Sequence, residues 1–261
     1  MRHHEQTLAA FTGDQSARPE VLGVIVVGSV ARGDERSDSD VDLYLVLTDD
    51  AYDAAAAIGQ VAYVTGLGVS YPGGYLDVKL ASPHYLRAAV DEGDDPTRAS
   101  FDRGRVIFDR TGELGELVDR MADLSEQAWS QRVHTYRAQL DLYGGYFLVQ
   151  AHQRGNRFLL LHSAVHSCLA AGRLALAQAR RLYRGQKYLA ADLAALTELP
   201  VGFLTAWWAV MNDPTPGSAH TLIQIVADWL GEPLSVDESL STFITTNELS
   251  WLNRTIPPEY W

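Results

Sequence analysis

The feature that most constrains this chain is a pair of aspartates at the start of an apolar, strand-like run. In the segment DVDLYLVL (40–47), strand alternation places Asp40, Asp42 and Tyr44 on one face and the residues between them on the other. Two carboxylates that project the same way, about 7 Å apart along the backbone, repel each other, and partial burial adds to the cost. We therefore expect the pair to bind a divalent cation, since Mg²⁺ prefers carboxylate and phosphate oxygens.

A glycine-serine turn precedes this pair. The segment VLGVIVVGS (21–29) is apolar and rich in β-branched residues, so it predicts a buried strand ending at Gly28 and Ser29. Backbone N–H groups at such a turn are open to a phosphate, because glycine has no side chain to obstruct the approach. Taken alone, Gly-Ser after a strand is also typical of an ordinary turn.

A third carboxylate follows in a later segment. VSYPGGYLDVKLAS (69–82) predicts a Pro-Gly-Gly turn and then a strand over 75–81 that carries Asp77. If this strand pairs beside 40–47, Asp77 reaches the same edge, and three acids there can hold two metal ions about 3.5–4 Å apart for in-line phosphoryl or nucleotidyl transfer. The alternative is that Asp77 forms an ion pair with Lys79 on its own face.

In this order, the motifs resemble a known signature. GSVARGDERSDSDVDL (28–43) resembles the nucleotidyltransferase signature of the DNA polymerase β-type superfamily, in which Gly-Ser, a spacer and Asp-x-Asp follow one another. The Arg-Gly after Gly-Ser and the serine before Asp40 are most similar to bacterial minimal and antibiotic (aminoglycoside- or lincosamide-type) nucleotidyltransferases. FDRGRVIFDRTGELGELVDRM (101–121) is similar to the strand, turn and helix that close this domain in bacterial members.

The resemblance implies roles for the matched residues. Asp40, Asp42 and Asp77 would be the catalytic metal ligands, and Asp77 is also the candidate general base for an acceptor hydroxyl. The implied nucleotide-binding residues are Gly28, Ser29, Arg32, Ser39 and Lys187. The implied cofactors are two Mg²⁺ ions, with ATP as the nucleotide donor.

Two of these assignments depend on particular matches. Arg32 would neutralise the polyphosphate. Lys187 is assigned because ARRLYRGQKYL (179–189) is similar to a segment before Lys-Trp-Leu in some relatives, although Tyr188 stands where tryptophan is usual.

The chain changes character near its middle. Residues 1–122 predict helix 5–18, strand 21–29, strand 40–48, an alanine-rich helix over 50–66, strand 75–81 and a final strand-turn-helix. From residue 123 to 261 the pattern is helical and rich in alanine and leucine. We expect an α+β fold, in which a small mixed-sheet nucleotidyltransferase domain (1–122) precedes an α-helical bundle domain (123–261) that forms the acceptor side of the cleft.

Charge and composition limit the kinds of molecule that this protein is expected to bind. The net charge of −12 disfavours nucleic acid and favours a small-molecule acceptor, in particular a cationic one. The lone cysteine, Cys168, lies in an apolar helical segment, so we expect a buried structural thiol and a cytoplasmic protein. No run of 18 apolar residues occurs, so we expect no membrane association, and either a monomer or a homodimer.

Three functions are compatible with these features. The first is Mg²⁺-dependent transfer of a nucleoside monophosphate, AMP from ATP, to a hydroxyl of a small molecule such as an antibiotic. The second is a nucleotidyltransferase of the toxin–antitoxin kind that modifies RNA or protein. The third is a non-catalytic nucleotide-binding protein, whose usual mark, the loss of one metal-binding acid, is missing here.

Several other motifs have ordinary interpretations that we favour. Arg157 and His162 have the spacing of the HEPN ribonuclease motif, and His162 with His166 could bind a metal, but we expect polar residues on a mostly buried helix. The acidic run 91–95 predicts a solvated loop or helix end. We expect the tail 254–261 to be extended, owing to its two prolines. The remaining aromatic and histidine expectations are a core position for Trp207, Trp208 and Trp229 and a disordered terminus at His3 and His4.

Overall fold

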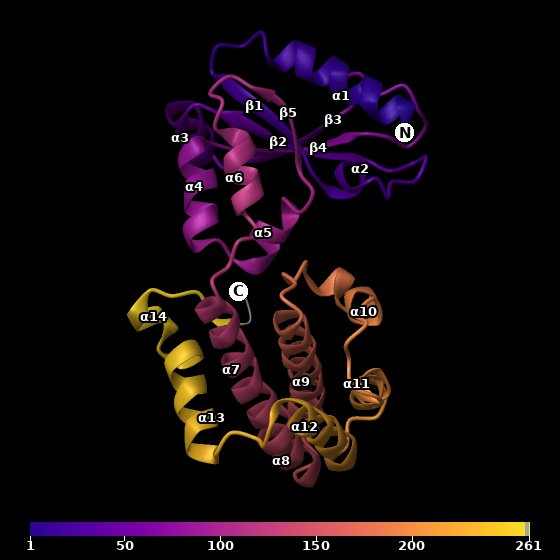
Figure 1. Cartoon of the computed structure of the whole chain (residues 1–261), viewed down its shortest axis with the longest axis vertical. Helices are drawn as coiled ribbons and strands as arrows, with labels where there is room; N and C mark the ends of the chain where they lie inside the picture. The colour runs from indigo at the N-terminus through magenta and orange to yellow at the C-terminus, as the bar shows by residue number, and fades with distance from the viewer. Residues whose placement is uncertain (259–260) are drawn as a thin grey trace. The chain divides into compact units, whose positions relative to one another are not determined.

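The computed structural model describes residues 1–258 and 261, and it divides into two compact units, Met1–Asp123 and Leu124–Trp261 (Figure 1). The first unit contains the sheet, and the second is helical. Each is described by itself below.

The first unit is built on a five-stranded mixed sheet with strand order β3-β4-β2-β1-β5. Its strands are β1 (Val21–Val26), β2 (Val41–Leu47), β3 (Ala62–Thr65), β4 (Leu76–Ala81) and β5 (Arg105–Asp109). β2 and β4 are parallel, whereas the other neighbouring pairs are antiparallel. The predicted α+β class is therefore confirmed, and the strand with the Asp-x-Asp motif is the central one.

Helices cover both faces of this sheet (Figure 1). On one face, α1 (Arg2–Gln15) contributes Leu8 and Phe11 to a cluster with the strands. The opposite cluster takes residues from α4 (Pro83–Glu92) and α6 (Leu114–Arg120), beside α5 (Asp95–Ser100). A strand covered on both faces must be apolar throughout, which explains the sequence LYLVL in β2. The short helices α2 (Gly28–Arg32) and α3 (Asp49–Ala57) follow β1 and β2.

Three local predictions in this unit are wrong. The strand predicted over 21–29 ends at Val26, because Gly28 adopts a φ of +69° and starts α2. The helix predicted over 50–66 ends at Ala57, and after a turn residues 62–65 of that segment form β3, where β-branched residues pair with β4.

The third error concerns the N-terminus. α1 begins at Arg2, and His4 is fully buried instead of lying in a disordered terminus. The reason is that His3 and His4 are both hydrogen-bonded to the loop before β2.

The second unit is helical. Its elements are α7 (Glu126–Leu142), η1 (Tyr143–Phe147, a π-helical turn), α8 (Leu148–Gln153), α9 (Arg157–Gln178), α10 (Gln186–Ala194), α11 (Phe203–Asn212), α12 (Pro216–Leu230), α13 (Val236–Phe243), η2 (Ile244–Glu248, also π-helical) and α14 (Ser250–Asn253). α9 is long and apolar enough to cross a bilayer by length and composition, but 61% of its apolar window is buried, as in the core helix of a soluble protein. The tail 254–261, which we expected to be extended, follows α14. Its residues 259–260 lie outside the described part of the chain.

The core of the helical unit explains the lone cysteine. Cys168 is buried, its Sγ lies 3.4 Å from the Trp207 carbonyl oxygen, and the Trp207 indole donates to the Cys168 carbonyl oxygen at 2.7 Å. Burial raises the pKa of the Cys168 thiol to about 12, so the predicted structural role is confirmed. Trp208, by contrast, is 46% exposed, because adjacent positions on a helix face different directions. Its predicted core position is wrong.

Candidate active site

The site begins with a close contact between the turn after β1 and the start of β2. The Val27 N–H donates to the Asp42 carbonyl oxygen at 2.9 Å, which brings Gly28 beside the Asp42 side chain. A Cβ atom at residue 28 would collide with the Asp42 carboxylate and lie 2.9 Å from its Cγ. Because Gly28 also has a φ of +69°, glycine is required here both by the backbone and by the acid.

Gly28 and Ser29 form the first turn of α2. No side chain caps this end, where Val27 is the N-cap residue. The first N–H groups of a helix have no intrahelical acceptor and carry the positive end of its dipole, so this turn offers donors suited to a phosphate. Gly33 closes the turn at a φ of +77°, and its N–H donates to the Ser29 carbonyl oxygen at 2.9 Å.

The three aspartates lie at neighbouring strand positions. The predicted pairing of the Asp77 strand beside β2 is confirmed, because Asp42 is the register partner of Asp77 across the parallel pair β2–β4. Asp40 directly precedes β2, and the Val41 N–H donates to the Tyr75 carbonyl oxygen at 2.9 Å, which continues the β2–β4 pairing toward Asp40.

The charges at this edge interact. Burial raises the pKa of the Asp42 carboxyl, and the negative charges of Asp40 and Asp77 raise it further, against the opposing effects of Lys79 and Arg32. The pKa of Tyr75 is also raised, first through a hydrogen bond of its hydroxyl with Asp40. The carboxylates therefore repel one another, which is the conflict expected from the sequence.

This donor set fits a divalent cation in its chemistry. Carboxylate oxygens are the ligands that Mg²⁺ prefers, and a cation would relieve the repulsion that raises the pKa of Asp42. The side chains themselves are not gathered: among residues 1–258 and 261, no three acidic, histidine or cysteine side chains lie close enough to hold an ion. The fit therefore rests on the residue types and on the backbone register.

A family comparison agrees with this geometry. A family model described as a nucleotidyltransferase domain matches residues 13–76, a range that includes Gly28, Asp40 and Asp42 and stops one residue before Asp77. The chain contains a nucleotidyltransferase domain. The superfamily predicted from residues 28–43 is thereby confirmed, and the match supports a nucleotidyl transfer function.

Comparison with solved structures agrees with this fold. The chain is similar to the crystal structure of a nucleotidyltransferase-like protein from Exiguobacterium sibiricum, with a TM-score of 0.52 and 16% sequence identity. The match covers 94% of this chain and 80% of the other. At that identity the likeness shows the fold alone. No curated protein matches the chain.

An aromatic layer closes one side of the acidic edge of the nucleotidyltransferase domain. Tyr44, two residues beyond Asp42, stacks on Phe101 with ring centroids 4.5 Å apart, and its hydroxyl lies 3.2 Å from the Ser100 Oγ. Lys79, the alternative partner for Asp77, places its Nζ 5.9 Å from the centre of the Tyr44 ring. The alternation of β2 predicted the face of Tyr44, but its partners come from a segment about 57 residues away, and no local pattern indicates that contact.

Two further predicted residues lie at the end of α2 and in the loop that leads from it to β2. Arg32 is largely shielded, with 16% of its side chain exposed, and its Nε lies 3.2 Å from the Asp34 carboxylate. The Ser39 hydroxyl accepts a hydrogen bond from the Arg36 N–H at 2.9 Å, so this side chain shapes the loop that leads to Asp40. Asp38, in the same loop, forms an exposed ion pair with Arg36.

The remaining residues singled out from the sequence lie in the helical unit. Lys187 is exposed on α10, with its Nζ 5.4 Å from the Tyr188 ring centre, and its contact with a nucleotide stays a prediction. Arg157 and His162 are exposed at the start of α9, not on a buried face. His162 contacts the ring of His166 at a centroid distance of 4.2 Å.

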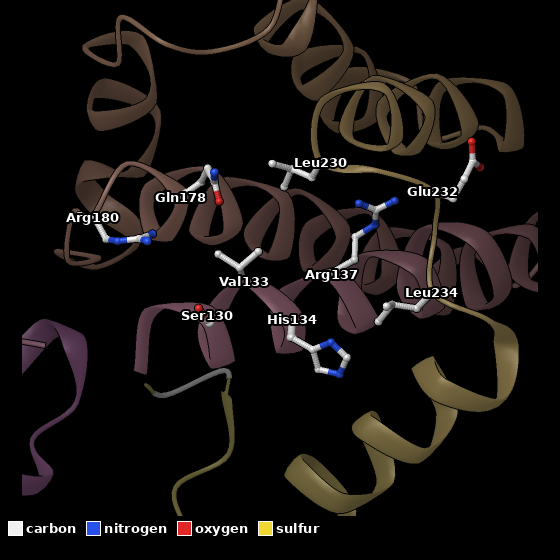
Figure 2. Close-up of a pocket in the computed structure, with 9 residues that line it drawn as sticks. All are labelled: Ser130, Val133, His134, Arg137, Gln178, Arg180, Leu230, Glu232 and Leu234. Atoms are coloured by element: carbon white, nitrogen blue, oxygen red, sulfur yellow. The ribbon is translucent and has the colours of Figure 1, made fainter. Parts of the chain in front are cut away.

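The helical unit also contains a pocket of about 280 Å³ (Figure 2). Arg137, on α7, is the buried cation of its wall, 5% exposed, with a hydrogen bond of 3.0 Å to the Gly231 carbonyl oxygen and an ion-pair distance of 3.6 Å to Asp141. Arg180 and Glu232 contribute opposite charges to the same lining. This lining offers more positive than negative groups.

The acidic excess of the chain belongs to the other unit. In residues 1–123, acidic residues outnumber basic ones two to one, whereas in residues 124–261 the two kinds are almost equal. The excess of acidic residues, which suggested a cationic acceptor, therefore belongs to the unit with the nucleotidyltransferase domain. The unit that contains the pocket is almost neutral.

Proposed function

We propose that this protein is a Mg²⁺-dependent nucleotidyltransferase that moves AMP from ATP to a hydroxyl of a small-molecule acceptor, such as an aminoglycoside or lincosamide antibiotic, in the cytoplasm. The observation that carries the proposal is the contact of the Gly28 turn with the Asp42 carboxylate, with Asp77 opposite on β4. A phosphate-binding turn and a metal-binding acid are thereby adjacent, as transfer from a nucleoside triphosphate requires.

Different residues would bind the phosphates and the cation. The amides of the first turn of α2 would bind phosphate oxygens, and Arg32 would neutralise part of their charge. Asp40, Asp42 and Asp77 would hold Mg²⁺, which when bound supplies positive charge to the polyphosphate and orients it. Since the pKa of Asp42 is raised in the free protein, this carboxyl must give up any bound proton before it can bind a cation.

In the transfer step, the acceptor hydroxyl oxygen bonds to the α-phosphorus while the bond from that phosphorus to the pyrophosphate oxygen breaks. Asp77 takes the hydroxyl proton, which makes it the general base of the proposal. Pyrophosphate leaves with the electron pair of the broken bond.

The acceptor is proposed to be a small molecule because the acidic surplus of the nucleotidyltransferase unit opposes a polyanion such as RNA. Within that class, the charge distribution favours a cation close to the acidic unit.

Mass spectrometry after incubation with ATP and Mg²⁺ tests the proposal. A panel of hydroxylated amines and antibiotics should yield one product heavier by a single adenylyl group, with release of pyrophosphate. The Asp42→Asn variant is the control and should give none. Failure of the wild-type protein to adenylylate any member, combined with no Mg²⁺-dependent binding of ATP, would overturn the proposed activity.

A further inference from the structure

The loop of residues 33–40 ends at Asp40, a proposed metal ligand. Side chains from outside the loop form hydrogen bonds to it. Much of it is exposed, including Arg36, of which 81% of the side chain is accessible. Two of its backbone carbonyl oxygens accept hydrogen bonds from elements far away in the sequence, and the Glu35 carboxylate pairs with the N-terminal ammonium of Met1. The loop also forms a turn of its own, in which the Arg36 N–H donates to the Ser39 hydroxyl and the Ser39 N–H donates to the Arg36 carbonyl oxygen, so the distant donors fix an already formed turn to the rest of the domain.

Three aromatic side chains provide these distant donors. The His3 Nε2 lies 3.1 Å from the Ser37 carbonyl oxygen, and the His4 Nε2 lies 3.1 Å from the Ser39 carbonyl oxygen. The Tyr71 hydroxyl donates to the same Ser39 oxygen at 2.8 Å. We call these three residues the histidine–tyrosine clamp. The Ser39 oxygen therefore has two donors, from α1 and from the segment before β4.

The clamp is itself well packed. The centroid distances are 4.4 Å between His3 and Tyr71, 4.9 Å between His4 and Tyr71, and 4.2 Å between the two histidines. His4 is fully buried, and α1 is tied to the core by Leu8 and Phe11 one and two turns further on. The donors are thus fixed to a rigid element.

The tautomer of His4 follows from its surroundings. A carbonyl oxygen can only accept, so the Nε2 of His4 must carry the proton that it shares with Ser39. The Nδ1 of His4 is buried and has no hydrogen-bond partner, so a second proton there would be unsatisfied. His4 is therefore a neutral Nε2–H donor.

The anchored oxygen is adjacent to a proposed metal ligand. The Ser39 carbonyl and the Asp40 nitrogen and Cα belong to one planar peptide group. Two donors that fix the Ser39 oxygen consequently fix the plane from which the Asp40 side chain projects. Asp40 then needs no search of backbone conformations when a cation arrives.

We propose that His4 and Tyr71 are positioning residues that hold Asp40 in the orientation needed to bind the nucleotide-associated cation. This inference rests on the proposed nucleotidyl transfer function. It differs from a merely structural role, in which the clamp would only attach α1 to the domain.

Direct binding of Mn²⁺, a spectroscopic substitute for Mg²⁺, tests the inference without turnover. We expect Tyr71→Phe and His4→Phe each to weaken Mn²⁺ binding in the presence of ATP by on the order of tenfold, as measured by electron paramagnetic resonance, because outer-shell partners commonly contribute that much to metal affinity. His4→Gln, whose amide nitrogen can replace Nε2 as a donor, should restore most of the affinity. The Mg²⁺ concentration for half-maximal activity should shift in parallel.

A matched control separates positioning from stability. Thr7→Val removes a different hydrogen bond of α1, from the Thr7 hydroxyl to the Gly68 carbonyl oxygen at 3.2 Å, and leaves the clamp intact. It should lower the unfolding midpoint but leave Mn²⁺ affinity unchanged. If Tyr71→Phe binds Mn²⁺ like the wild type, or if Thr7→Val weakens binding as much at equal stability, the positioning role is overturned.

Mn²⁺ binding also distinguishes failure of the proposed function from failure of the positioning role alone. Wild-type protein that binds no Mn²⁺ with ATP, and behaves like Asp40→Asn, overturns the proposed function together with this inference. Wild-type protein that binds Mn²⁺ through Asp40 but is indifferent to the clamp overturns this inference alone.

Discussion

Asp42 and Asp77 occupy directly opposing positions on the parallel strands β2 and β4, with no residue between them in the register. The pKa of Asp42 is raised by burial and by its acidic neighbours, so the folded state disfavours its ionised form relative to the unfolded state. Ionised Asp42 therefore costs the metal-free protein stability near neutral pH.

The Asp42→Asn variant should accordingly be more stable than the wild type in the absence of divalent cations near neutral pH. As the pH falls through the raised pKa of the folded state and then below the ordinary aspartate pKa of 3.8, the wild-type carboxyl becomes protonated in both states, and the difference in the free energy of unfolding should vanish. Urea unfolding with a chelator at several pH values measures this. A variant that is less stable at every pH would contradict the assignment of repulsion at this edge.

Addition of Mg²⁺ with ATP should reverse that order. A ligand that binds only the folded state raises the free energy of unfolding by an amount that grows with its concentration. We expect the unfolding midpoint of the wild type to rise and that of Asp42→Asn to stay where it was, in a thermal unfolding experiment. Equal shifts in both proteins would place the cation elsewhere.

Gly28→Ala should both strain the backbone at residue 28 and displace the Asp42 carboxylate. A φ of +69° costs an alanine about 1–2 kcal/mol, and the new Cβ also displaces the Asp42 carboxylate. Gly33→Ala is a matched control, since Gly33 has a φ of +77° but nothing within 4 Å of a Cβ. We expect similar losses of stability in urea unfolding, but at least a tenfold loss of transfer rate only in Gly28→Ala. Identical rates in the two variants would argue against the Gly28–Asp42 contact as a site feature.

Arg32→Ala should raise the KM for ATP roughly tenfold, because a shielded guanidinium beside a polyphosphate contributes about 1.5–3 kcal/mol through charged hydrogen bonds. Arg36→Ala in the same loop provides the comparison, since Arg36 is exposed and pairs only with exposed Asp38 among the ion pairs of the described residues. Steady-state kinetics would count against the role of Arg32 if both variants changed the KM alike.

Cys168 should be chemically silent in the folded protein. With a pKa of about 12, it is a protonated thiol at neutral pH, and it is buried in the helical unit. Maleimide labelling should follow global unfolding in urea, and Cys168→Ala should keep the transfer rate while losing about 1 kcal/mol of stability. Rapid labelling of the native protein would contradict the burial described here.

The acidic edge could be predicted from the sequence because its signals are local. Alternation along β2 placed Asp40, Asp42 and Tyr44 on one face, and a turn before 75–81 indicated the strand that carries Asp77. The pairing of the two strands confirmed that expectation.

The errors arose where distant contacts decide the structure. His3 and His4 gave no sequence signal, because their acceptors lie 34 and 35 residues away. The helix before β3 ends just before Gly59, a left-handed glycine with a φ of +71°, which the expectation of a helix over 50–66 overlooked, and pairing with β4 completes the strand that follows.

The contact of Gly28 with Asp42 has a consequence for how such a domain can diverge. Asparagine often tolerates a positive φ, yet at residue 28 its Cβ would displace the Asp42 carboxylate, so glycine is the residue that leaves the acid at residue 42 in its place. The two positions are therefore constrained as a pair through descent. A homologue that has lost the acid is released from the glycine as well, so a side chain at the position of Gly28 would mark a lineage in which the proposed transfer chemistry has been abandoned.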